Sequence, residues 1–166
     1  SAASDVYKRQ ALYHLKDEEF DDFASEVTET SRIFVAGKGL SGFVANSFVM
    51  RLNQLDKDAY IIGELTTPSI QKGDLFVVIS GSGSTEHLRL LADKAKSVEA
   101  DVVLITTKFD SAIGEIADTV VELPSGTKHD ADGSDQPLGS LFEQSSQIFL
   151  DSVITVSYTH LRAHET

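Results

Sequence analysis

The segment LFVVISGSGSTEHLRLLADKAKSV, residues 75–98, decides the fold because three kinds of pattern follow one another in it. It opens with LFVVIS (75–80), a nearly continuous apolar run that is typical of a strand buried on both faces of a sheet. A loop in which serine alternates with glycine comes next, and residues 84–98 then have helical spacing, with Ser84 as the expected N-cap. A strand, a glycine-rich loop and a helix in this order predict one unit of a parallel α/β sheet.

The same alternation of apolar strands and amphipathic helices extends to both sides of this segment. Further strands are expected at 32–36, 59–63, 101–106 and 119–123, and further helices at 11–30, 41–55, near 110–117 and from about 138 to 154. The pattern predicts a three-layer αβα sandwich of flavodoxin-like type, whose five parallel strands lie in the order 2-1-3-4-5. In such a sheet, ligands bind outside the carboxyl ends of the strands, at the switch point between the first and third strands.

Composition limits the classes of protein to which the chain can belong. Its 166 residues, 41% of them hydrophobic and 24% charged, are typical of one globular domain, and the absence of cysteine excludes disulfides and thiolate metal sites. The net charge of −12 repels phosphate backbones, so we expect no nucleic-acid partner. No apolar run approaches the roughly 20 residues that a membrane helix needs, and we predict a cytoplasmic protein without a membrane partner.

The two ends of the chain differ from the rest in their periodicity. SAASDVYKRQ (1–10) and TVSYTHLRAHET (155–166) show no clear period, and both resemble translated sequencing-adaptor sequence. We therefore expect one domain over residues 11–154, flanked by termini that are non-native or disordered. Ordinary frayed termini are the alternative.

Two polar loops follow the first and third expected strands. Residues 37–42, GKGLSG, match the pattern G-x-G-x-x-G, whose glycines allow a tight turn and a close backbone approach ahead of a helix N-terminus. Residues 80–85, SGSGST, offer hydroxyls and backbone N–H groups to phosphate oxygens. Each loop alone is typical of an ordinary turn, but on the predicted sheet order both flank one crevice, which predicts a shared phosphate site.

The first loop also fits a dinucleotide-binding site. Glu64 follows the second strand about 20 residues after the glycines, where an acid that binds ribose is expected. The chain has no room for a second catalytic domain, however, and a dinucleotide site does not require the serine-rich second loop. We therefore favour a sugar phosphate over a dinucleotide as the ligand.

Three segments carry a resemblance to a known family. SRIFVAGKGLSGFVANSFVMRLNQL (31–55), GELTTPSIQKGDLFVVISGSGSTEHLRLLADKAK (63–96) and PLGSLFEQSSQIFLD (137–151) resemble the 6-phospho-3-hexuloisomerases, which are small sugar-isomerase (SIS) domain enzymes. The resemblance implies the interconversion of D-arabino-hex-3-ulose 6-phosphate and D-fructose 6-phosphate in the ribulose monophosphate pathway of formaldehyde fixation. It also implies a homotetramer with sites between its subunits.

The resemblance further implies roles for individual residues. The implied ligands of the phosphate are Ser80, Gly81, Ser82 and Thr85, the implied ligand of the sugar is Ser41, and the implied catalytic base is Glu143. Gly39 of the first loop joins the expected binding site.

Two features depart from the family pattern. Leu40 stands where the family usually has arginine, which removes a cation that Lys38 can replace. The family also continues beyond residue 154 into a further helix that carries a histidine.

Moving a carbonyl by one carbon needs a base but no cofactor or metal. One carboxylate can transfer the proton through an enediol when its pKa lies near neutrality. Helical spacing alone places Glu143 away from the apolar stripe of its helix, on a face that the pattern predicts to be solvated, and only the resemblance makes it the base. Glu64 is the rival base, or a hydrogen-bond partner of a sugar hydroxyl.

Other polar residues near the predicted crevice have less specific signals. Arg51 fits a surface or inter-subunit ion pair as well as a contact with substrate, and His87 fits the first turn of a helix better than acid–base chemistry. Lys128 and His129 lie in a long polar loop that can close over the crevice. The five histidines show no metal-ligand spacing, so we expect no metal. Two other functions stay open: an isomerase of another sugar phosphate, such as a pentose phosphate, and a sensor that binds a sugar phosphate without turnover.

Overall fold

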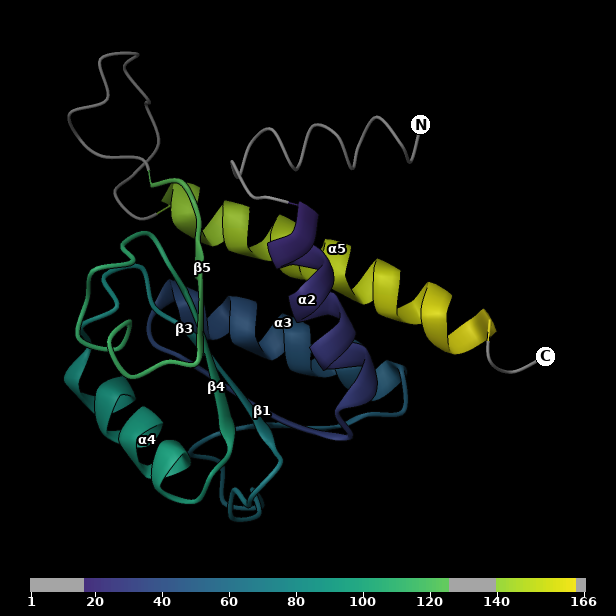
Figure 1. The fold of residues 1–166 in the computed structure, drawn as a ribbon, viewed down its shortest axis with the longest axis horizontal. Coiled ribbons are helices and arrows are strands. Elements are labelled where there is room, and N and C mark those ends of the chain that lie inside the picture. Colours follow the sequence, from purple (N-terminus) through teal and green to yellow (C-terminus); the bar gives the residue numbers. More distant parts are fainter. Residues whose placement is uncertain (1–16, 126–139, 164–166) are drawn as a thin grey trace.

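A computed structural model describes residues 17–125 and 140–163, which form four helices around one parallel sheet (Figure 1). The strands are β1 Arg32–Gly37, β2 Asp58–Ile61, β3 Leu75–Ile79, β4 Asp101–Thr106 and β5 Thr119–Glu122, and the helices are α2 Asp17–Glu29, α3 Leu40–Gln54, α4 Glu86–Ser97 and α5 Ser140–Ala163. All neighbouring strands are parallel and their order is β2-β1-β3-β4-β5, which confirms the predicted topology. The switch point therefore lies between β1 and β3, where the two loops begin.

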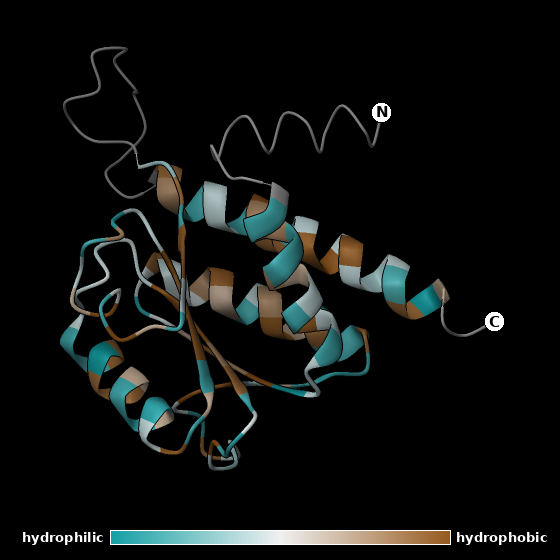
Figure 2. Cartoon of the chain, viewed as in Figure 1, coloured by the Kyte–Doolittle hydropathy of each residue, from teal (hydrophilic) through white to brown (hydrophobic). Residues whose placement is uncertain are grey.

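Helices cover both faces of the sheet, so the predicted three-layer αβα sandwich is confirmed. Successive side chains of a strand point to opposite faces, and Val35 of β1 packs with α2, α3 and α5 while the neighbouring Phe34 packs with α4. All residues of β3 are buried, as expected for a strand enclosed from both sides. Figure 2 shows the hydrophobic residues concentrated along the strands between the helices. Burial of these residues is the main source of stability of the fold.

The helix expected near residues 110–117 is absent, and the segment forms turns instead. Its apolar spacing is correct, since Ile113 is fully buried, but the backbone N–H of Ile113 donates to the carbonyl of Gly83 at 2.8 Å rather than to its own segment. Gly114 marks a tight fold in the chain, because a Cβ atom there would lie 2.2 Å from the backbone oxygen of Phe109. A tertiary hydrogen bond and a glycine turn thus replace the predicted helix.

The last helix is longer than predicted, and the expectation that the C-terminal segment is disordered is wrong for residues 155–163. α5 continues through these residues to Ala163, with Val153 and Ile154 buried against the core. The buried Ser157 lies within hydrogen-bond distance of Thr28 of α2, with 2.8 Å between the two hydroxyl oxygens. That part of the chain is non-native stays a prediction, and residues 1–16 lie outside the described structure. No helix among the described residues combines the length and the hydropathy needed to cross a membrane.

Candidate functional site

The first loop joins β1 to α3 in a turn that depends on glycine. A Cβ atom on Gly37 would lie 2.6 Å from the backbone oxygen of Ser41, so the end of the strand touches the first helical turn. Gly39 has a φ of 59°, a left-handed conformation that residues with a Cβ atom rarely adopt. Gly39 is also the N-cap of α3 and offers no side chain, so no described side chain caps this helix and its N-terminus can receive an anion.

The second loop leaves β3 and is held in shape by its own hydroxyls and glycines. Ser80 is buried, and its Oγ atom accepts a hydrogen bond from the backbone N–H of Gly83 at 3.1 Å. Gly83 has a φ of 63°, and a Cβ atom there would lie 2.3 Å from the Oγ atom of Ser111. Any larger residue at this position would strain the backbone and clash with its neighbour at the same time. The loop can therefore keep this shape only with glycine at position 83.

The helix that follows the second loop begins one residue later than predicted. Thr85 rather than Ser84 is the N-cap of α4, because the Ser84 hydroxyl turns back to donate to the carbonyl of Ser82 at 3.2 Å. The Thr85 side chain makes no capping hydrogen bond with the helix, and its Oγ1 atom lies 3.5 Å from Oγ of Ser80. The first N–H groups of α4 are thus without a side-chain cap among the described residues and favour an anionic group.

The structure brings the two loops together, as the sheet order predicted. Gly37 at the end of β1 is in register with Ile79 at the end of β3, and Ser80 follows Ile79 directly. Both loops therefore leave the sheet at the same level on adjacent strands. Leu40, which departs from the family pattern, and Lys38, which can replace the lost cation, are both exposed in the first loop.

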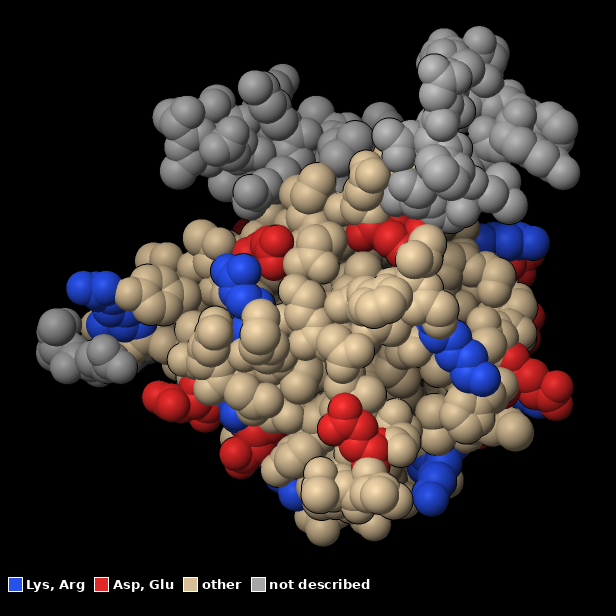
Figure 3. Space-filling view, turned by 180° about the vertical axis from the view of Figure 1, so that it is seen from behind, with Lys and Arg blue, Asp and Glu red and all other residues tan. Residues whose placement is uncertain are grey.

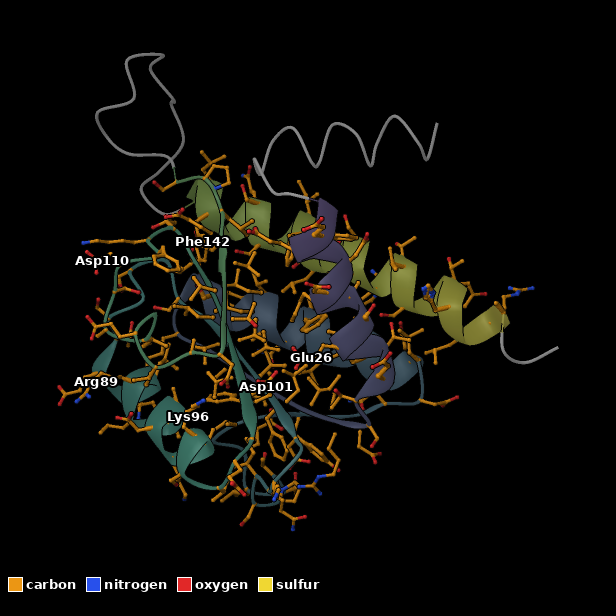
Figure 4. All side chains as sticks on the ribbon, in the orientation of Figure 1. Glu26, Arg89, Lys96, Asp101, Asp110 and Phe142 are labelled. Atoms are coloured by element: carbon orange, nitrogen blue, oxygen red, sulfur yellow. The ribbon has the colours of Figure 1, made fainter. Side chains whose placement is uncertain are left out.

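The first turn of α5 lies against the second loop. The ring of Phe142, labelled in Figure 4, lies 3.3 Å from the position that a Cβ atom on Gly81 would take. Glu143 is the next residue, and its Oε2 atom is buried without a hydrogen-bond partner among the described residues. A buried carboxylate oxygen of this kind is costly unless a ligand or another group completes it, which marks Glu143 as a candidate functional residue.

A second set of contacts places Glu143 beside the first loop as well. Gln147 of α5 donates from Nε2 to Oγ of Ser47 on α3 at 3.1 Å, and Asp151 lies 3.6 Å from Arg51 on α3. Residue numbers rise together in these two pairs, so the helices run in the same direction. Positions 143, 147 and 151 share one face of α5, which puts Glu143 level with the first turn of α3. The face that helical spacing predicts to be solvated is therefore half-buried against α3, and that prediction is wrong.

Arg51 and Glu64, two of the predicted binding residues, lie at different places relative to the two loops. Arg51 is ten residues beyond Ser41 on α3, about 15 Å along the helix, and it pairs with Asp151. Glu64 follows β2 at the carboxyl edge of the sheet, on the correct side for the crevice, and its side chain is exposed. His87 is exposed in the first turn of α4, as its sequence context predicted.

The remaining expectations concern the long polar loop and metal binding. Lys128 and His129 lie outside the described residues. Within the described ranges, no group of three or more His, Cys, Asp or Glu side chains is placed to hold a metal ion. Phe142, which the sequence analysis did not single out, packs against Gly81 of the second loop, and its position directly before Glu143 is the signal that could have indicated this.

Comparisons with known proteins agree with this fold. The family model of the SIS domain matches residues 26–147, and the chain belongs to the SIS domain family. Within that family it is similar to proteins named 3-hexulose-6-phosphate isomerase. The protein of that name from Bacillus subtilis is 42% identical over 144 residues, covering 85% of this chain and 78% of the relative. The protein of that name from Methylomonas aminofaciens is 44% identical over 138 residues, covering 81% and 75%.

A solved structure supports the same grouping. A crystal structure of a Methanococcus jannaschii protein, for which a function as 3-hexulose-6-phosphate isomerase has been inferred, superposes with a TM-score of 0.80 at 30% identity. The superposition covers 96% of this chain and 88% of that protein. The resemblance deduced from the three sequence segments is therefore confirmed at the level of the family.

Proposed function

We propose that the chain isomerises D-arabino-hex-3-ulose 6-phosphate to D-fructose 6-phosphate, as a step of formaldehyde fixation in the ribulose monophosphate pathway. The observation that carries this proposal is the buried carboxylate oxygen of Glu143, which has no partner among the described residues. It lies beside two adjacent loops whose helix N-termini carry no side-chain cap in the same described part of the chain. The names of the similar proteins from Bacillus subtilis and Methylomonas aminofaciens support the choice of substrate.

In this proposal the second loop binds the phosphate. Hydroxyls of Ser80, Ser82 and Thr85, the backbone at Gly81 and the N-terminus of α4 surround the dianion. These groups act locally, which is necessary because the net charge of −12 disfavours any anion at long range. Binding energy from the phosphate, remote from the reacting carbons, then serves to orient them.

The sugar lies between the first loop and α5. Gly39 and Ser41 face its hydroxyls from the first loop, and Glu64 hydrogen-bonds a hydroxyl from the end of β2. Glu143 removes the proton from C2 of the 3-ketose, which gives the 2,3-enediol, and returns it to C3. The hydroxyl proton passes from the C2 oxygen to the C3 oxygen, so the carbonyl appears at C2 with no change in the number of electrons. No cofactor takes part in this scheme.

We also propose that the protein acts in the cytoplasm as a homotetramer. Leu40, Phe43 and Met50 lie on one side of α3, and Phe43 is 73% exposed, which is unusual for a large apolar side chain. Figure 3 shows that the face of the molecule turned away in Figure 1 carries only scattered charges between uncharged residues. A second copy of the chain would remove these apolar side chains from water.

The substitution Glu143→Gln tests the proposal. We expect it to lower the rate of fructose 6-phosphate formation by about 10²- to 10⁴-fold, since a general base is lost, while inorganic phosphate still binds. Glu64→Gln tests the rival base, and it should lower the rate far less, because only a hydrogen bond to a sugar hydroxyl is weakened. Unchanged turnover in Glu143→Gln would remove this residue from the role of base.

The same assay separates the other two functions. Wild-type turnover of a pentose phosphate but not of the 3-hexulose phosphate would indicate a different sugar-phosphate isomerase. Phosphate binding by the wild-type chain with no turnover in either case would indicate a sensor.

A further inference from the structure

The carbonyl of Gly81 in the second loop accepts hydrogen bonds from three donors on one neighbouring segment. Thr106, the last residue of β4, donates from its hydroxyl at 3.0 Å. Thr107 donates twice, from its backbone N–H at 3.1 Å and from its hydroxyl at 2.7 Å. A carbonyl with three donors is held far more firmly than a loop carbonyl that faces water.

This arrangement fixes the direction of the next backbone N–H group. The peptide bond between Gly81 and Ser82 is trans and planar, so its C=O and N–H groups point in opposite directions. The C=O points toward β4, which lies on one side of β3. The N–H of Ser82 must therefore point to the opposite side, where β1 and the crevice lie.

The rest of the loop is held from the same side. The carbonyl of Gly83 accepts a hydrogen bond from the N–H of Ile113 at 2.8 Å, and Ser111 packs against the α-carbon of Gly83. The segment between β4 and β5 thus supports the loop from behind, away from the ligand side. None of these bonds requires a ligand, so the loop is shaped before an anion arrives.

We propose that Thr107 is a positioning residue for the phosphate group, acting through the Gly81 carbonyl to aim the Ser82 N–H at the crevice. Thr107 itself does not touch the substrate. Its hydroxyl makes the shortest of the three bonds to that carbonyl. The Thr106 hydroxyl also accepts from the N–H of Lys108 at 3.2 Å, so a substitution at Thr107 is the more selective way to weaken the hold on Gly81. This inference rests on the proposed function, because it names a residue that prepares the proposed phosphate site.

The variant Thr107→Val removes the hydroxyl but keeps the branched shape and the backbone N–H. We expect the KM for the sugar phosphate and the Kd for inorganic phosphate, measured by calorimetry, to rise about five- to tenfold, the ratio that one lost hydrogen bond produces. The kcat should stay within about twofold, because the phosphate is held equally in the ground state and the transition state, so a weaker hold acts on KM. Thr107→Ser, which restores the hydroxyl, should return both constants to the wild-type values.

Thr28→Val on α2 is the matched control for a purely structural effect. Thr28 is also half-buried, and its hydroxyl also donates to a backbone carbonyl at 2.7 Å, but it lies just before β1, at the edge of the sheet opposite to both loops. We expect it to lower the melting temperature without changing KM or Kd. If Thr107→Val lowers the melting temperature as Thr28→Val does and leaves both constants unchanged, the positioning role is wrong.

The phosphate measurement keeps this inference separate from the proposed reaction. Weaker phosphate binding in Thr107→Val, in a chain whose wild type turns over no substrate, would support the positioning role and overturn the isomerase. Normal turnover by the wild type and unchanged constants in Thr107→Val would do the reverse. A wild-type chain that does not bind inorganic phosphate at all would overturn both.

Discussion

The two edges of the sheet hold their backbone in different ways. At the amino edge, charged side chains bind backbone groups and one another, whereas at the carboxyl edge hydroxyls and glycines shape the second loop. Asp74, buried just before β3, accepts hydrogen bonds from Arg32 at 3.0 Å and from the N–H of Gln71 at 2.7 Å. Asp118, just before β5, accepts from the N–H of Val102 at 2.8 Å and pairs with Lys96. These charges are saturated by partners within the chain.

At the carboxyl edge, no described charged side chain shapes the second loop, and the carboxylate of Glu122, which accepts from the N–H of Phe109 at 3.0 Å, acts at the end of β5. The second loop is shaped by the hydroxyls of Ser80 and Thr107 and by the glycine at position 83. Its helix N-terminus is without a side-chain cap, and the carboxylate of Glu143 has a buried oxygen without a partner among the described residues. In a parallel sheet, internal contacts can stabilise the amino edge while the carboxyl edge stays open for a ligand.

Adding one methyl group at a glycine of each edge should have the largest effect. Gly83→Ala at the carboxyl edge combines a positive φ with a Cβ atom 2.3 Å from Ser111, so we expect a loss of about 2–5 kcal/mol in the free energy of unfolding. Phosphate binding should be lost as well. Gly73→Ala at the amino edge also has a positive φ, but its Cβ atom would meet nothing within 4 Å, and it should cost only about 1 kcal/mol.

Urea unfolding and phosphate calorimetry of both variants check this expectation. Equal losses of stability in Gly83→Ala and Gly73→Ala would contradict the close packing behind the second loop.

Removing a charge from the closed edge should come second. Asp74→Ala leaves Arg32 and the N–H of Gln71 without their acceptor, and we expect a loss of about 2–3 kcal/mol. Asp74→Asn keeps the shape and one acceptor oxygen and should lose less. Phosphate affinity should be unchanged in both variants, and a weaker affinity would show that the two edges are not independent.

A pH effect of smaller size is expected at the same edge. Burial, followed by the hydrogen bond with Asp118 and the charge of Asp118, raises the pKa of Asp101 to about 6. Burial also raises the pKa of Asp118, but hydrogen bonds from Lys96 and the N–H of Val102 outweigh this effect and lower the pKa of Asp118. The folded chain therefore holds the Asp101 proton more tightly than the unfolded chain, so this contribution to stability is present at low pH and is lost as pH rises through about 6.

Asp101→Asn should remove this part of the pH dependence. Asp101 faces the carboxylate of Asp118, which is paired with Lys96. It also lines a cavity of about 460 Å³ together with three carboxylates of α2, those of Asp22, Glu26 and Glu29. Figure 4 labels Glu26 and Asp101. Relative to wild type, the variant should gain stability as pH rises from about 4 to about 6 in urea titrations, and the gain should stay constant at higher pH. A stability difference that does not vary with pH would contradict the raised pKa.

The smallest effect is expected at Arg51. Its ion pair with Asp151 is 3.6 Å long, and both side chains are more than one third exposed, at 40% for Arg51 and 35% for Asp151. Arg51→Met should therefore cost less than about 0.5 kcal/mol and change turnover by less than about twofold. A large loss of turnover with normal stability would assign Arg51 to the substrate instead.

The sheet and the position of both loops could be predicted because they depend on local pattern. Apolar runs mark the strands, and the order 2-1-3-4-5 brings the ends of β1 and β3 together whatever the side chains are. The missing helix near 110–117 could not be predicted in the same way. The N–H of Ile113 donates to the carbonyl of Gly83, which is distant in sequence, and such a bond leaves no periodic pattern of apolar residues.

The surroundings of Glu143 were hidden from the sequence for the same reason. Its face of α5 is covered through the contact of Gln147 with Ser47, two residues that are 100 positions apart. Helical spacing reports the single most apolar stripe of a helix, and a second, polar interface on the same helix leaves no periodic signal. The role of Glu143 was indicated by family resemblance alone, and Thr107 was not indicated at all.

A loop that is anchored from behind has little conformational freedom left to lose. The amide proton of Thr107, bound to the Gly81 carbonyl at 3.1 Å, should exchange with solvent almost as slowly as the amides inside the sheet. Ligand association should then carry only a small entropic penalty from ordering the protein, and the structure of the loop should be nearly the same empty and filled. The site would then be preorganised for its ligand rather than formed by induced fit.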